Sequence, residues 1–209
     1  MVNNAWAALT ALAVMTVLGL SYQLSKQNGW YTRRMTLAFK GLTTLTAAML
    51  ALYAFCLTGE PFAFVLAAGL LLCAVADVML EHRFHFGMAL FASGHLAYIL
   101  SFFLRRTPGP MSFVVFLVIA FATALAARSI RGKVGFNVLP YFTYALIIAA
   151  MLSLSLSQPP LTFFGAAFFA VSDALIARRL IQPEARSFDK TCIALYYSGQ
   201  YLLALSALA

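Results

Sequence analysis

Three ionisable side chains, Lys40, Asp77 and Asp173, lie inside long apolar stretches of the sequence. An ionisable group within a membrane is costly, so each of the three is a candidate for function. Two carboxylates in unlike surroundings can divide acid and base work, because burial favours the protonated form of one while a nearby cation keeps the other ionised. The pattern therefore predicts general acid–base chemistry at a buried polar site.

Further polar side chains lie in the same apolar stretches or at their ends and could support that site. They are His95, Tyr98, Tyr144, Tyr197, Gln200, Arg178 and Arg179. His95 and Tyr98 are three residues apart, as are Tyr197 and Gln200, so each pair shares one face of a helix. A polar pocket between bundled helices accounts for the whole set.

Structural interpretations of the same residues stay open at the level of sequence. Lys40 could extend to the lipid headgroups, or Asp77 could pair with it structurally. His95 and Gln200 could hold neighbouring helices together by hydrogen bonds, as polar residues do in membrane bundles.

The composition indicates which elements position these residues. Of 209 residues, 63% are apolar and 10% are charged, and the mean hydropathy is +0.90. A soluble domain is about 45–50% apolar and about 25% charged. These values exclude a soluble enzyme, a secreted disulfide scaffold and a disordered chain, and they predict one integral membrane domain over residues 1–209.

The apolar runs are continuous enough for membrane-spanning helices, each of which needs about 20 residues. The sequence predicts eight spans, at residues 5–22, 36–57, 61–80, 85–104, 111–128, 137–157, 160–177 and 191–208. The breaks between them carry glycine and proline, as at Asn28-Gly29, Pro108-Gly109-Pro110, Pro159-Pro160 and Pro183.

The positive charges predict the orientation of these spans. Eleven Lys and Arg residues follow the odd-numbered spans, whereas only Arg105 and Arg106 lie in the other connections. The odd connections are therefore expected in the cytoplasm and both termini on the opposite side. The net charge of +8 is a topology signal, and no nucleic-acid partner is expected. Arg178 and Arg179 could be such topology charges, partners of Asp173, or ligands for a phosphate.

The two halves of the chain resemble each other. Three pairs of segments match, at residues 74–80 and 170–176, 93–95 and 198–200, and 47–50 and 149–152, with offsets of 96, 105 and 102 residues. The matches predict a parallel repeat of four plus four spans, with halves at about 1–107 and 108–209, and they make Asp77 and Asp173 equivalent. The cysteines lack metal-ligand spacing, so neither a metal nor another cofactor is expected.

Taken in order along nearly the whole chain, these residues resemble the YhhN-type family, the lysoplasmalogenases. The matching pieces are Lys40, Asp77, Phe86-Gly87, Gly94-His95-Leu96-Ala97-Tyr98, Tyr144-Ala145-Leu146-Ile147, Ser172-Asp173 and Tyr196-Tyr197-Ser198-Gly199-Gln200. Two pieces depart from the family pattern, because its Lys-Pro is Lys40-Gly41 here and its Gly-Asp is Ala76-Asp77. Both changes alter the backbone and keep the charged group.

The resemblance implies an intramembrane hydrolase that cleaves the vinyl ether bond of lysoplasmalogens. The products would be a fatty aldehyde and glycerophosphocholine or glycerophosphoethanolamine. For this reaction we assign Asp173 as the acid and Asp77, with Lys40, as the ionised partner, and the reverse assignment stays open. The polar residues His95, Tyr197 and Gln200 would orient water or the glycerol hydroxyl.

The expected partners are a lysophospholipid substrate and membrane lipids. We expect a multi-pass protein of the plasma membrane, the inner membrane in a bacterium, with a site that opens toward the cytoplasm. The alternative function is a lipid or small-molecule transporter or flippase, because parallel repeats and polar residues near the membrane midplane suit that class as well.

Overall fold

The computed structural model describes residues 2–131, 137–181 and 189–209. These ranges contain eight α-helices and no β-strand, which confirms the all-α fold class. The helices are α1 (Val2–Asn28), α2 (Arg33–Thr58), α3 (Pro61–His82), α4 (Phe84–Arg105), α5 (Pro110–Ile130), α6 (Leu139–Ser155), α7 (Pro160–Ile181) and α8 (Asp189–Ser206). The predicted topology charges Lys133 and Arg186, and the predicted break at Pro183, lie outside the described residues.

Length and composition make most of these helices suitable for crossing a membrane. Within the described ranges, six are long and apolar enough, namely α1 to α5 and α7. Helix α6 is apolar but has only 17 residues, and α8 is not among the six. A multi-pass membrane protein fits these helices, and membrane crossing by α6 and α8 stays a prediction.

Local sequence explains where several helices begin and end. Proline occupies the first turn of α3, α5 and α7, where its missing N–H costs no intrahelical hydrogen bond. Thr32 caps α2 by accepting a hydrogen bond from the Met35 backbone N–H at 3.3 Å. Gly59 ends α2 with φ 69°, a left-handed conformation that glycine adopts without strain.

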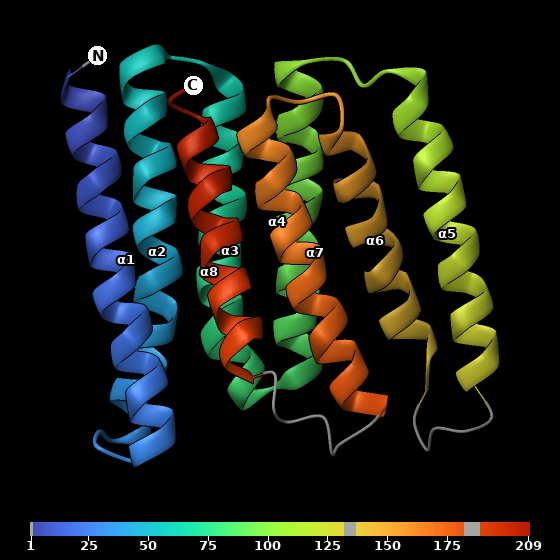
Figure 1. Ribbon diagram of the computed structural model, residues 1–209, viewed down its shortest axis with the longest axis horizontal. Coiled ribbons are helices and arrows are strands. Elements are labelled where there is room, and N and C mark those ends of the chain that lie inside the picture. Colours follow the sequence, from blue (N-terminus) through green and yellow to red (C-terminus); the bar gives the residue numbers. More distant parts are fainter. Residues whose placement is uncertain (1, 132–136, 182–188) are drawn as a thin grey trace.

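Figure 1 shows the helices side by side as an elongated bundle, with α1 and α5 at opposite extremes. Both termini lie at one end of the bundle, together with the α2–α3, α4–α5 and α6–α7 connections. The α1–α2 and α3–α4 turns lie at the other end, together with the last residues of α5 and α7. The odd-numbered helices therefore all end at the same face, which carries the cavity described below.

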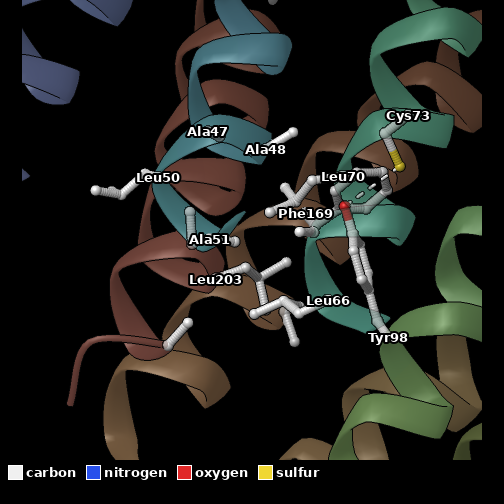
Figure 2. Packing of buried hydrophobic residues seen from close by; sticks show 14 of the residues in the cluster. Ala47, Ala48, Leu50, Ala51, Leu66, Leu70, Cys73, Tyr98, Phe169 and Leu203 are labelled. Atoms are coloured by element: carbon white, nitrogen blue, oxygen red, sulfur yellow. Dashed lines mark hydrogen bonds between the residues drawn. The ribbon is translucent and has the colours of Figure 1, made fainter. Parts of the chain in front are cut away.

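Small residues let the central helices approach closely. Ala47, Ala51 and Ala54 of α2 are completely buried, and Figure 2 shows the first two beside the larger side chains of α3, α7 and α8. At the α3–α4 crossing, a Cβ added to Gly94 would lie 2.9 Å from the Gly69 carbonyl oxygen. Such contacts leave no room for any side chain, so glycine is required by the packing there.

A second crossing of the same kind joins α7 and α8. A Cβ added to Gly199 would lie 2.9 Å from the carbonyl oxygen of Gly165. The two glycine crossings bring α3 against α4 and α7 against α8, the helix pairs that carry most of the predicted site residues.

Candidate active site

A cavity of about 580 Å³ opens between the helices near the face where α3 and α7 end and α6 and α8 begin. Its wall is mostly apolar, with aliphatic and aromatic side chains from α3 to α8. The charged side chains on the wall are Lys26, Lys40, Asp77, Glu81, Asp173, Arg179 and Asp189. The two predicted catalytic carboxylates are thus brought to one cavity from helices that lie far apart in sequence.

Asp77 is the more enclosed of the two carboxylates, with 1% of its surface exposed. Its Oδ2 accepts hydrogen bonds from the Thr44 hydroxyl of α2 at 2.5 Å and from the Tyr196 hydroxyl of α8 at 2.8 Å. The Lys40 Nζ of α2 lies 3.9 Å from its Oδ1. An ionised carboxylate is stabilised by exactly such donors, so this surrounding suits a negative charge at Asp77.

Asp173 lines the same cavity from α7 and has a simpler surrounding. Its Oδ2 accepts a hydrogen bond from the Tyr144 hydroxyl of α6 at 2.5 Å. Arg179, a predicted alternative partner, instead donates to Asp189 at 2.6 Å. Lys40 lies beside Asp77, whereas the Tyr144 hydroxyl contacts Asp173. The two carboxylates therefore line the cavity in unlike environments.

Lys40 is shared between two acidic side chains. Its Nζ lies 3.6 Å from Glu81 Oε1, closer than to Asp77. Glu81 lies in the last turn of α3 and lines the cavity. Four residues separate Glu81 from Asp77, so both carboxylates lie on one face of α3. Lys40 therefore contacts two carboxylates, in place of the extension to the lipid headgroups that the sequence left open.

A buried polar cluster lies behind the cavity wall. The Tyr98 hydroxyl donates to Gln200 Oε1 at 2.8 Å and to Cys73 Sγ at 3.3 Å, and the latter contact is drawn in Figure 2. His95 Nδ1 lies 2.5 Å from the Phe91 carbonyl oxygen, and the imidazole packs against Phe169 with ring centroids 4.3 Å apart. The Tyr98–Gln200 bond joins α4 to α8 and matches the interpretation of Gln200 as an interhelical hydrogen-bond group, whereas the His95 contact with Phe91 stays within α4.

Five of the predicted supporting residues do not line the cavity. The described residues that line the cavity do not include His95, Tyr98, Tyr197, Gln200 or Arg178. The Tyr197 ring packs against α1, where a Cβ added to Gly19 would lie 3.2 Å from it. Their predicted role in orienting water or substrate is therefore not supported by where they lie.

An ionic cluster marks the mouth of the cavity. Asp189 is the first residue of α8, and its carboxylate forms two ion pairs. The Arg179 guanidinium of α7 lies 2.6 Å from Oδ1, and the Lys26 Nζ of α1 lies 3.8 Å from Oδ2. All three side chains line the cavity and are between 31% and 46% exposed. In the described part of the chain, no group of three or more His, Cys, Asp or Glu side chains is placed to hold a metal ion.

Three polar groups that were not among the predicted site residues contact the two candidate carboxylates or Lys40. Tyr196 and Thr44 donate to Asp77, and Glu81 approaches Lys40. Thr44 had a usable signal, because it lies four residues after Lys40 on the same helix face. Tyr196 stands beside Tyr197 in the motif that matches the family, but the crossing geometry of α8 decides which of the two faces the cavity.

Comparison with known proteins assigns the chain to a family. The model of the YhhN family matches residues 35–207, which includes both carboxylates, Lys40 and both tyrosine donors. The chain belongs to the YhhN family. Family membership extends over most of the chain, and the match begins two residues into α2.

Curated relatives in this family carry an enzyme name. Lysoplasmalogenase TMEM86B of Homo sapiens is 33% identical over 144 residues, an alignment that covers 67% of this chain and 62% of the human protein. The proteins of the same name from Sus scrofa and Mus musculus are each 32% identical, over 147 and 144 residues, with 66% and 67% of this chain and 61% and 62% of theirs covered. The chain thus spans less than two thirds of the length of these relatives. No solved structure matches it.

Proposed function

We propose that this YhhN-family protein is a lysoplasmalogenase, a membrane-embedded hydrolase that cleaves the vinyl ether bond of a lysophospholipid. The observation that carries the proposal is a mostly apolar cavity lined by two carboxylates in unlike surroundings. Asp77 faces an ammonium group and two hydroxyl donors, whereas Asp173 has one tyrosine donor. The name of the curated relatives supports this reaction over other lipid chemistry.

The first step is proton transfer from Asp173 to carbon. Asp173 Oδ2 accepts the hydrogen bond from Tyr144, so Oδ1 carries the proton that is transferred to the β-carbon of the vinyl ether. Protonation at that carbon leaves an oxocarbenium ion at the carbon bonded to the ether oxygen. The negative charge of Asp77, kept by Lys40, Thr44 and Tyr196, stabilises this cation.

The second step consumes water. Asp173, now ionised, takes a proton from a water molecule as the oxygen bonds to the oxocarbenium carbon. The resulting hemiacetal collapses to aldehyde as its hydroxyl proton passes to the leaving glycerol oxygen. The carboxylate therefore regains its proton in each cycle, by the acid-to-base exchange that glycosidase carboxylates also perform.

The shape of the cavity supports a single-chain lipid as substrate. Its wall follows α6 from Tyr141 at the mouth to Leu152, a rise of about 16 Å at 1.5 Å per residue. Beyond Tyr144 the α6 residues on this wall are apolar, with Ile148 and Leu152 among them. A hydrocarbon chain would lie along this inner wall, while the glycerol and headgroup would face the charged mouth.

We further propose the predicted topology for the whole chain, with eight spans in a parallel four-plus-four repeat. The glycine crossings support it, because Gly165 follows Gly69 by 96 residues, the offset that relates Asp173 to Asp77. Both termini would lie on the non-cytoplasmic side, and the cavity would open to the cytoplasm from the plasma membrane. A compartment-sensitive reporter fused to either terminus tests this orientation.

The function is tested with purified protein given lyso-alkenyl and lyso-acyl phospholipids side by side, with products followed by mass spectrometry. Aldehyde from the first lipid and no fatty acid from the second are expected. Fatty acid release would indicate an ester hydrolase instead. Lipid movement in proteoliposomes without aldehyde release would favour the transporter.

The two-carboxylate mechanism is tested by Asp77→Asn and Asp173→Asn in protein that remains folded. Each substitution is expected to abolish aldehyde release, because the first removes the charge that stabilises the cation and the second removes the acid. Near-normal turnover in either variant would refute the mechanism. Asp173→Glu, which keeps the carboxyl group, is expected to retain part of the activity.

A further inference from the structure

The charges around the cavity divide into two clusters of opposite net charge. At one side of the mouth, the single carboxylate of Asp189 is shared by Lys26 and Arg179, which leaves one positive charge in excess. At the other side, the Lys40 ammonium is shared by Asp77 and Glu81, so these three ion-paired side chains carry one negative charge in excess. The Arg33 guanidinium donates to the backbone carbonyl oxygen of Glu81 at 3.1 Å and not to its carboxylate. Neither cluster is neutral by itself, and both line the same cavity.

The negative side also has aromatic walls. Phe84 and Tyr141 line the cavity with their ring centroids 6.1 Å apart, and Phe84 follows Glu81 closely in the chain. Aromatic faces next to a carboxylate form a favourable site for an ammonium group, because the ring quadrupole attracts a cation. Glu81 is 42% exposed, so its carboxylate is accessible to a ligand while it contacts Lys40.

We propose that the mouth recognises a zwitterionic phosphodiester headgroup, with Lys26 and Arg179 binding the phosphate and Glu81, beside Phe84 and Tyr141, binding the ammonium. The excess charge of each cluster is then matched by the opposite charge of the ligand. The inference rests on the proposed function for the identity of the lipid as a lysophospholipid, and it adds the residues that select the headgroup.

The depth of the two acidic residues on α3 agrees with this placement. Glu81 lies four residues closer to the mouth than Asp77, a rise of about 6 Å. A glycerol unit bridges a comparable distance between the ether oxygen and the phosphate. With the ether bond at the two aspartates, the headgroup falls at the level of the ionic clusters.

The proposal is tested by binding, which needs no turnover. The probes are three lipids with the same saturated ether chain, which lacks the cleavable double bond, and with phosphoethanolamine, phosphoglycerol or no phosphate at C3. Wild-type protein in detergent is expected to bind the phosphoethanolamine lipid most tightly. Glycerophosphoethanolamine without a chain, added alone, shows whether the headgroup binds independently of the lipid.

Substitutions on the two sides of the mouth are expected to weaken the binding of different lipids. Lys26→Gln and Arg179→Gln are expected to weaken both phosphate-bearing lipids by about fivefold and to leave the phosphate-free lipid unchanged. Glu81→Gln is expected to weaken only the phosphoethanolamine lipid by a similar factor. Arg34→Gln is the matched control, because Arg34 lies at the same face of the bundle and is not among the described residues that line the cavity.

The outcomes separate this inference from the proposed function. The ammonium site would be overturned if Glu81→Gln weakened binding of all three lipids equally, or of none. The phosphate site would be overturned if Arg179→Gln weakened the phosphate-free lipid as much as the phosphate-bearing lipids. If aldehyde release is normal and the headgroup pattern is absent, the headgroup inference alone fails. If the binding pattern holds and no aldehyde forms, the proposed function fails. Thermal melting of each variant excludes misfolding as the cause.

Discussion

Two adjacent tyrosines on α8 offer a direct test of the carboxylate environment. The Tyr196 hydroxyl donates to Asp77 at 2.8 Å and lines the cavity. Tyr197, which the sequence had suggested as the functional residue, is not among the described lining residues and packs toward α1. Tyr196→Phe removes one hydroxyl from the site and keeps the ring, and Tyr197→Phe makes the same chemical change one residue away.

The expected loss follows from the number of donors that Asp77 keeps. A hydrogen bond to a charged group is worth about 1.5–3 kcal/mol, and Thr44 still donates to the same oxygen at 2.5 Å after the substitution. If the bond acts in the transition state, this range corresponds to a fall in kcat/KM of roughly 10- to 150-fold. The physical reason is that Asp77 is then held less firmly and its negative charge has one donor fewer.

The assay is aldehyde release by purified protein over a range of lysoplasmalogen concentrations, with a thermal melt of each variant. We expect kcat to fall in Tyr196→Phe, because the lost bond acts on the charge that stabilises the cation and not on the headgroup. Tyr197→Phe is expected to keep activity close to wild type. If Tyr197→Phe lost activity and Tyr196→Phe did not, the assignment of donors to Asp77 would be refuted.

Three further predictions follow from the same contacts. Lys40→Met should lower kcat more than Lys40→Arg, because the second keeps a cation near the α3 carboxylates; equal activities in the aldehyde assay would contradict this. Tyr144→Phe should lower kcat by roughly tenfold, since it removes the hydroxyl donor of the carboxylate on α7; unchanged turnover would show that this donor is dispensable. Gly94→Ala should destabilise the bundle by about 1–3 kcal/mol in a detergent unfolding assay, because the new Cβ would lie 2.7 Å from Cys73 Sγ. Gly109→Ala is the matched control, since its Cβ would meet nothing closer than 3.7 Å.

Most of the helical architecture could be predicted from the sequence. Apolar runs with glycine and proline between them determine where helices of membrane length begin and end, and the described helices start and stop within a few residues of the predicted ranges except at α1. Helix α1 continues to Asn28, six residues beyond the prediction, because polar residues such as Gln23 and Lys26 continue the helix outside the apolar run. Hydropathy therefore located the membrane-facing part of α1 and not the end of the helix.

The candidate site could be predicted in its charged members and in Tyr144, whose hydroxyl contacts Asp173. Lys40, Asp77 and Asp173 were identifiable because an ionisable group is costly in an apolar stretch, and the structure brings all three to one cavity. Hydroxyl donors such as Thr44 and Tyr196 have no comparable cost, so their residue type does not single them out.

The sequence alone indicated a bundle of membrane-length helices and its charged residues, and it predicted acid–base chemistry, because hydropathy and isolated ionisable groups are local properties of the chain. The tertiary structure decided how those residues are used. The close helix crossings place Tyr196 and Thr44 at Asp77, place Tyr144 at Asp173, and leave His95 and Gln200 behind the wall. Such assignments depend on the rotation of each helix about its own axis, which is set by contacts between residues distant in sequence and not by any local pattern.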